Sequence, residues 1–136
     1  MNAEQKRAWL GVGSGVACVI VYLVLLPFLG PYGAGAAFGI FGVNGFAPFI
    51  GRGEKQDERD RTILRNATLA GAMVSYMTFI LGCMGTWCVA YAWQRHPQVS
   101  VHVLPMITFL GALVFYLVRS AVILLLYNRH VEADNV

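Results

Sequence analysis

Arg119 is the one charged residue inside a long apolar run near the end of the chain, from Val103 to Tyr127. A helix needs about 20 apolar residues to cross the hydrocarbon of a bilayer, and a charge at that depth is costly unless it is paired or reaches the headgroups. The other apolar runs contain no Asp or Glu, so an acidic partner has to come from a terminus or a loop. Arg119 is therefore the first candidate for a functional side chain.

Three uncharged polar residues are expected at the same depth as Arg119. At about 1.5 Å per helical residue, Asn44 lies roughly 10 Å and Arg119 roughly 12 Å from the inner ends of their apolar runs. Ser14 and Thr68 fall at a similar height in two other runs. The sequence predicts a buried polar layer whose donors and acceptors complement one another, made of Ser14, Asn44, Thr68 and Arg119. The alternatives are a guanidinium that extends to the headgroups and a site for an anion or substrate.

Four sulfur-containing side chains share one face of the third apolar run. At about 100° per residue they fall within about 60° of one another, in the order Met73, Met77, Met84 and Cys88. Sulfur atoms aligned along one helix face could bind Cu(I) ions in succession as they cross the membrane. Methionine side chains also commonly fill the interfaces between helices. We interpret the stripe as packing, with soft-metal transport as the alternative. All histidines lie outside the apolar runs and no Cys-x-x-Cys occurs, so neither a cofactor nor a metal site is expected.

The composition excludes several classes of protein. Hydrolytic catalysis needs a nucleophile, a base and an orienting group in reach, and the apolar runs hold neither acids nor histidines, so no enzyme is expected. Proton-coupled export usually rests on an intramembrane carboxylate, which is also missing. Of the 136 residues 57% are hydrophobic and only 12% are charged, which leaves almost no surface for nucleic acid.

The elements that carry these residues are four apolar runs, predicted to be membrane-spanning helices of one all-α domain. They cover residues 8–29, 33–50, 63–93 and 103–127, and the third helix extends outwards from about residue 57. The basic residues that set the orientation lie almost all on one side, at Lys6, Arg7, Arg52, Lys55, Arg59, Arg61 and Arg129, with only Arg95 on the other. Both termini and the central loop are expected to face the cytoplasm, as in a four-helix bundle of the inner membrane.

Small residues mark the first two runs. The segment Gly30-Pro31-Tyr32-Gly33 predicts a tight outward turn, so the first two helices form an antiparallel hairpin. Gly35-x-x-x-Gly39 and Gly11-x-x-x-Gly15 match the spacing by which helices pack closely in lipid. We interpret them as packing within one chain. A homo-oligomer seam and a thin-walled permeation path are the alternatives.

The inner end of the second run predicts a break in its helix. Asn44, Gly45 and Pro48 loosen the turn and remove a backbone donor. Freed carbonyls at such a break can coordinate a cation, whereas an ordinary kink is the simpler interpretation.

The loop before the third run carries a compact charged motif. Asp57 is a good N-cap and Asp60 stands at position N3, so acidic residues face the positive end of the helix dipole. Arg61 and Arg65, one turn apart, are placed to bind lipid phosphates or to pair with these acids. We interpret the motif as a cap and an interfacial anchor. Recognition of a cytoplasmic partner is the alternative.

A resemblance rests on these residues. The run Asp57-Glu58-Arg59-Asp60 before a span, a short outer loop and the ending Tyr127-Asn128-Arg129 resemble a family of small prokaryotic four-span membrane proteins of unknown function, with a DER(D/E) signature. The similarity covers chiefly the segment from Asp57 to Arg129. It implies a four-helix membrane protein and no activity, and only the signature residues carry over.

The sequence predicts a small polytopic membrane protein that acts by association, as an accessory or regulatory protein with a charged cytoplasmic loop. Its expected partners are the lipid bilayer and a second copy or another membrane protein. The competing prediction is a small channel or transporter, for an anion or a soft metal ion, in which Arg119 and Asn44 line a pathway.

Overall fold

A computed structural model describes residues 3–50, 57–93 and 99–133. Its elements are α1 (Ala3–Gly33), η1 (Ala34–Phe49), α2 (Glu58–Cys88), η2 (Val89–Trp93) and α3 (Val103–Ala133). The predicted all-α class is confirmed, since the described residues form no strand. Arg52, Lys55 and Arg95, on which the predicted orientation partly rests, lie outside the described residues.

Three helices are long and apolar enough to cross a membrane: Ala3–Pro31, Glu58–Ala92 and Val103–Asn128. They correspond to the first, third and fourth predicted spans, and α1 and α3 extend beyond the predicted ends. Their large apolar side chains are strongly exposed, as at Phe28 (80%) and Leu81 (71%). Surfaces of this kind need lipid or protein to cover them.

The second predicted span differs from expectation because η1 is a 3₁₀-helix of 16 residues, not an α-helix. The predicted break is also wrong, since η1 is continuous to Phe49. In a 3₁₀-helix side chains three residues apart eclipse one another, which normally limits its length. Here Ala36, Gly39, Gly42 and Gly45 stand three residues apart. Residues this small eclipse without a clash along one face of η1, whereas the other two rows carry larger side chains such as Phe38, Val43 and Phe46.

The three-residue period sorts η1 into three rows. One row begins with the buried Ala34 and Ala37 and ends with the exposed Val43, Phe46 and Phe49. A second row reaches α3, where the Phe38 ring stacks on Phe109 at 5.0 Å between centroids. The third row is open, because a Cβ added at Gly39, Gly42 or Gly45 would meet no atom of the described chain within 4 Å.

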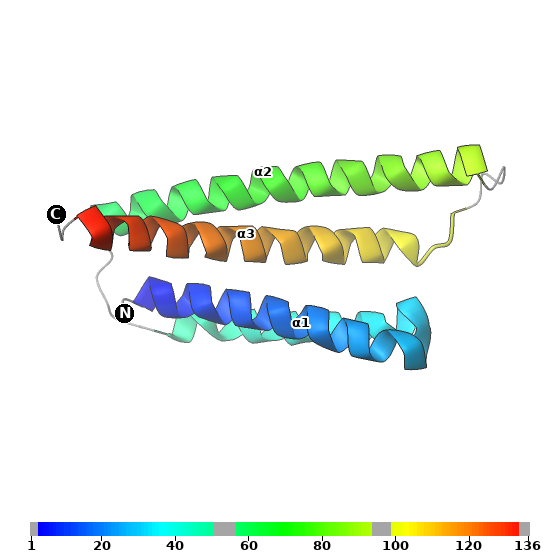
Figure 1. The fold of residues 1–136 in the computed structure, drawn as a ribbon, viewed down its shortest axis with the longest axis horizontal. Coiled ribbons are helices and arrows are strands. Elements are labelled where there is room, and N and C mark those ends of the chain that lie inside the picture. The colour runs from blue at the N-terminus through cyan, green and yellow to red at the C-terminus, as the bar shows by residue number, and fades with distance from the viewer. Residues whose placement is uncertain (1–2, 51–56, 94–98, 134–136) are drawn as a thin grey trace.

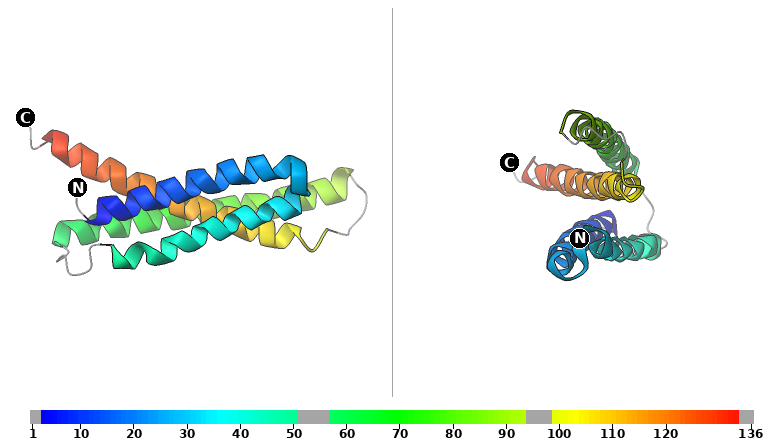
Figure 2. Two further views of the ribbon diagram at one scale, coloured as in Figure 1. Left: turned by 90° about the horizontal axis from the view of Figure 1, so that it is seen from below. Right: turned by 90° about the vertical axis from the view of Figure 1, so that its right-hand side faces the viewer.

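Two antiparallel hairpins make up the structure. In the first, the chain kinks at Gly30 (φ 69°) and returns along α1 as η1, within the turn predicted at Gly30–Gly33. In the second, α2 and α3 lie side by side, and α3 lies between α2 and α1 (Figure 1, Figure 2). The start of α1, the end of η1, the start of α2 and the end of α3 all lie at one end of the molecule, called the charged end below (Figure 1).

Small residues bring α1 against α3. A Cβ added at Gly11 would lie 2.2 Å from Ser120 Oγ, and one added at Gly15 would lie 2.5 Å from Leu117 Cδ2. The Gly11-x-x-x-Gly15 pair therefore packs within the chain, as interpreted from the sequence. Its closest contacts are with α3, while Asn44 Oδ1 of η1 lies 3.9 Å from the Cβ added at Gly11.

The seam between α2 and α3 uses small residues that the sequence analysis did not single out. A Cβ added at Gly71 would lie 3.0 Å from the backbone oxygen of Phe115. One turn further, Ser75 Oγ donates a hydrogen bond of 2.8 Å to the carbonyl of Gly111. Ala67, Gly71 and Ser75 are spaced four apart, which is the signal that predicts this seam.

Candidate functional site

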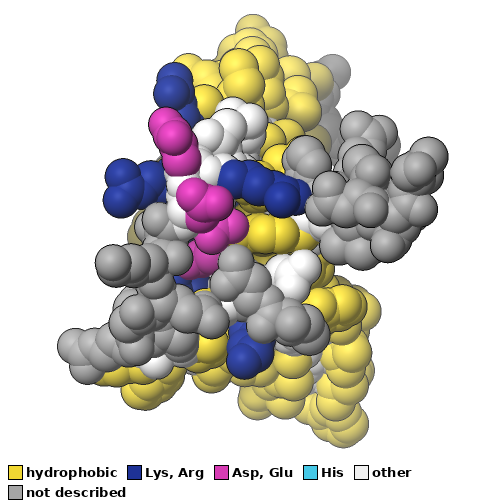
Figure 3. All heavy atoms as spheres, turned by 90° about the vertical axis from the view of Figure 1, so that its left-hand side faces the viewer, with side chains coloured by type: hydrophobic (Ala, Val, Ile, Leu, Met, Phe, Trp, Pro, Cys, Tyr) yellow, Lys and Arg dark blue, Asp and Glu magenta, His cyan; other side chains and the backbone are white. Residues whose placement is uncertain are grey.

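A polar cavity of about 360 Å³ opens among α1, η1, α2 and α3 near the charged end. Figure 3 looks onto this end, where acidic and basic side chains gather while hydrophobic ones cover the visible flanks. The cavity is lined by two guanidinium groups and one carboxylate, together with an amide and two hydroxyls: Arg7, Arg119, Glu4, Asn44, Tyr116 and Ser120. These charges sum to +1 (+2 from Arg7 and Arg119, −1 from Glu4).

Asn44 reaches the cavity because it belongs to the row of η1 that faces α3. Its Nδ2 donates a hydrogen bond of 2.9 Å to Ser14 Oγ. Ser14 is buried and donates in turn to the carbonyl of Gly11 at 3.1 Å. The amide is thus held in place by α1, with its orientation set by a buried hydroxyl.

Arg119 lies deeper than the other charged lining residues. It stands nine residues before Asn128, where the apolar part of α3 ends, which corresponds to about 14 Å. Its Nε donates to Thr68 Oγ1 at 3.3 Å, and this is the hydrogen bond that Arg119 makes within the described part of the chain. Thr68 is neutral, so the hydrogen bond supplies no counter-charge. The terminal nitrogens of the guanidinium remain available to the cavity.

Arg7 has a different environment. Its Nη1 contacts Glu4 Oε1 at 2.5 Å, and its Nε and Nη2 donate to the carbonyl of Ile50 at 3.0 and 2.7 Å. Ile50 caps the end of η1, where a cation is favourable because the last carbonyls carry partial negative charge. Arg7 therefore closes the first hairpin at the charged end while its guanidinium borders the cavity.

The predicted buried polar layer appears as two pairs, but only Ser14 is buried, whereas Asn44 and Arg119 are half-buried and Thr68 is exposed. Asn44 contacts Ser14, Arg119 contacts Thr68, and Asn44 and Arg119 line the same cavity. Sequence reasoning missed Glu4, Arg7, Tyr116 and Ser120 as lining residues. Ser120 adjoins Arg119 and was within reach of the depth argument, whereas Glu4 and Arg7 precede the first apolar run and carried no such signal.

The charged motif lies beside the cavity and does not line it. Asp57 Oδ1 caps α2 by accepting from the backbone N–H of Glu58 at 2.7 Å. Asp60 is buried and accepts a hydrogen bond from the Tyr127 hydroxyl of α3, a contact that the sequence did not predict. The motif thus joins the start of α2 to the end of α3. Its three basic side chains are exposed, at Arg59, Arg61 and Arg65.

The sulfur stripe lies on the outside of α2. Met73, Met77 and Met84 are 72%, 60% and 54% exposed, and Cys88 is exposed as well. These side chains therefore do not fill an interface within the described chain, contrary to the packing interpretation. A metal path along them would need a second wall from another chain.

The face of α3 that lines the two cavities changes from polar to apolar beyond Tyr116. The Tyr116 ring lies 5.8 Å from that of Phe41 of η1, between centroids. One turn further along α3, Leu113 begins the lining of a separate apolar cavity. The described lining residues therefore form no continuous polar path from one end of the molecule to the other. No protein-family model matches the chain, and no curated protein or solved structure matches it.

Proposed function

We propose that the protein is a small four-span membrane protein that binds an anionic group in the cavity bordered by Arg119, without catalysing a reaction. One observation carries the proposal: a guanidinium about 14 Å deep has a neutral hydrogen-bond partner and faces a cavity of about 360 Å³. A charge at that depth needs water or a counter-ion. Glu4 lines the same cavity and pairs with Arg7, so an anion that enters from the charged end would balance the remaining net charge of +1.

The topology is part of this proposal. With a rise of about 2.0 Å per residue, the 16 residues of η1 extend over about 32 Å, close to the roughly 30 Å of the hydrocarbon core. The 3₁₀ winding would thus let a short apolar segment cross the bilayer. The excess of Lys and Arg favours a cytoplasmic charged end in the inner membrane, so the cavity would open towards the cytoplasm.

The ligand is either a dissolved anion or the phosphate of a lipid headgroup, and two measurements distinguish them. Purified protein in neutral detergent is titrated with inorganic phosphate, and protein reconstituted in mixed phosphatidylcholine and phosphatidylglycerol vesicles is assayed for retained lipid. Phosphate binding identifies a dissolved anion. Retention of phosphatidylglycerol without phosphate binding identifies a headgroup.

Arg119→Gln should weaken the observed binding by about tenfold or more, since a hydrogen bond to a charged group contributes about 1.5–3 kcal/mol. Lys6→Gln removes a positive charge from an exposed side chain that does not line the cavity and should leave binding unchanged. Binding that is indifferent to Arg119→Gln would contradict the proposal. The proposal would also be contradicted if neither anion binds and Arg119→Gln lowers the thermal stability. Arg119 would then have a purely structural role.

Association between copies is a second candidate function, favoured by the open glycine row of η1. Gly39, Gly42 and Gly45 leave a surface without side chains that nothing in the described chain covers. We expect native mass spectrometry from lipid to detect a dimer that Gly42→Leu abolishes. Gly13→Leu, on an exposed and equally open position of α1, should leave the dimer intact. A monomer in every lipid tested would exclude this candidate.

A further inference from the structure

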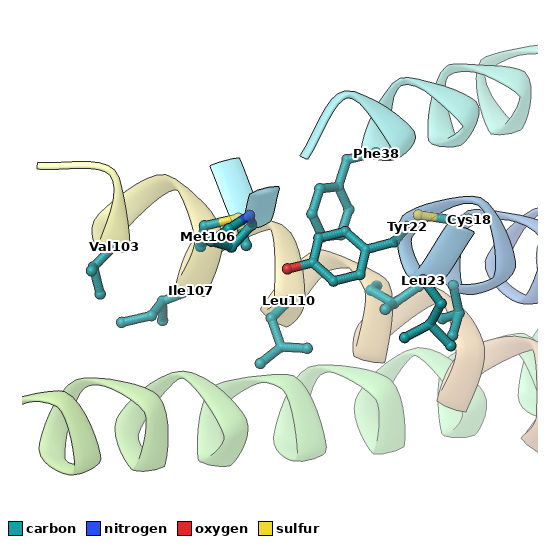
Figure 4. A pocket seen from close by; sticks show the side chains of 11 residues that line it. Cys18, Tyr22, Leu23, Phe38, Val103, Met106, Ile107 and Leu110 are labelled. Carbon is teal, nitrogen blue, oxygen red and sulfur yellow. The ribbon is translucent and has the colours of Figure 1, made fainter. Parts of the chain in front are cut away.

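The second cavity has the opposite chemistry. It measures about 490 Å³ and is lined by α1, η1 and α3, with side chains that are apolar except for the hydroxyl of Tyr22. The rings of Tyr22 and Phe38 lie together in it with their centroids 6.0 Å apart, and Met106 of α3 lies beside them (Figure 4). A cavity of this size falls in the range of small-molecule sites, about 300–1,000 Å³.

Its dimensions suit a hydrocarbon chain. Along α3 the lining runs from Val103 to Leu113, which is about 15 Å, or half of the roughly 30 Å hydrocarbon core. The cavity extends from the surface to the interior, because Leu23 is 59% exposed while Cys18 is 1% exposed. A chain in the bilayer can therefore enter from the side.

The two cavities follow one another along the same three helices. On α3, Leu113 lines the apolar cavity and Tyr116, one turn away, lines the polar one. On η1, Phe38 and Asn44 stand two 3₁₀ turns apart in the same row, one in each cavity. A molecule with a charged head and an apolar tail matches this succession of linings.

We infer that the ligand is an anionic amphiphile whose charged group contacts Arg119 and whose hydrocarbon chain lies in the apolar cavity. This inference rests on the proposed anion-binding function and names its ligand class. A chain that leaves the bilayer for a protein cavity gains little from the hydrophobic effect, because lipid tails are equally apolar. The charged head must therefore supply most of the affinity, and the apolar cavity selects for an attached chain.

The test compares two single-chain lipids by native mass spectrometry of the full-length protein in neutral detergent. Lysophosphatidic acid carries an anionic head and lysophosphatidylcholine a zwitterionic one. We expect the first to bind at least about tenfold more tightly, and Arg119→Gln to remove the difference. Equal binding of the two lipids to the wild-type protein would overturn the inference.

Leu23→Trp tests the position of the chain. A larger side chain at Leu23 fills part of the apolar cavity, and it should reduce binding of lysophosphatidic acid by about tenfold. Val24→Trp is the matched control, since Val24 is similarly exposed (57%) and does not line the cavity. Thermal unfolding of both variants verifies that they fold.

The outcomes separate the two proposals. If Leu23→Trp binds lysophosphatidic acid as the wild type does, the chain lies elsewhere and this inference fails, while anion binding at Arg119 stands. If neither lysophosphatidic acid nor a free or lipid-borne phosphate binds in an Arg119-dependent manner, the proposed function fails and the inference fails with it.

Discussion

Gly71→Leu is expected to destabilise the protein by about 1–3 kcal/mol, the typical cost of forcing extra atoms into a packed interface. A Cβ at this position would lie 3.0 Å from the backbone oxygen of Phe115 and 3.2 Å from Arg119 Cβ. A backbone atom cannot rotate away, so α2 and α3 must separate. Thermal unfolding in detergent, followed by circular dichroism, measures the effect.

Gly85→Leu is the matched control for this substitution. Gly85 lies on the same helix, is exposed, and has no atom of the described chain within 4 Å of an added Cβ. Both variants gain the same helix propensity, so the difference between their melting temperatures isolates the contact with α3. Equal melting temperatures would mean that α2 and α3 do not pack as described.

Arg7→Leu is expected to open the first hairpin at the charged end. The substitution removes the donors to the carbonyl of Ile50 and the ion pair between Arg7 and Glu4. Hydrogen bonds to charged groups contribute about 1.5–3 kcal/mol, and the Arg7 side chain is 26% exposed, so we expect a loss near the lower end of that range. The melting temperature and amide hydrogen exchange near the end of η1 both report the change.

Lys6→Leu is the control, because it removes the neighbouring positive charge from an exposed side chain. It should change neither the melting temperature nor the hydrogen exchange near the end of η1. The comparison separates the contact with Ile50 from a general effect of charge at the start of α1. Faster exchange confined to the end of η1 in the Arg7 variant is the expected signature. An unchanged exchange pattern would show that Arg7 does not close the hairpin.

Hydropathy was sufficient to predict most of the fold. The long apolar runs give helices because backbone polar groups in lipid must be satisfied within the segment. Asp57 caps α2 as predicted, because capping depends on the residue type and its next neighbours. Such local rules did not predict η1 as a 3₁₀-helix, although glycines three residues apart are visible in its sequence.

The candidate site was predictable only in part. Counting residues from the inner ends of the runs placed Asn44 and Arg119 at one depth, and they line one cavity. Depth gives one coordinate and leaves open the order of the helices around the bundle and the direction of each side chain. The pairing of Asn44 with Ser14 depends on the three-residue winding of η1, and that of Arg119 with Thr68 on the close approach at Gly71.

By itself the sequence determined an all-α chain with apolar helices, a capped third helix and a single deep guanidinium without an acid at its own level. Only the tertiary structure decided that α3 lies between α2 and α1 and that Arg7 reaches the carbonyl of Ile50. It also decided that a polar and an apolar cavity follow one another along α3. The physical reason is the range of the interactions. Helix formation and capping depend on neighbours within a turn, whereas these contacts join residues tens of positions apart and depend on which small-residue faces meet.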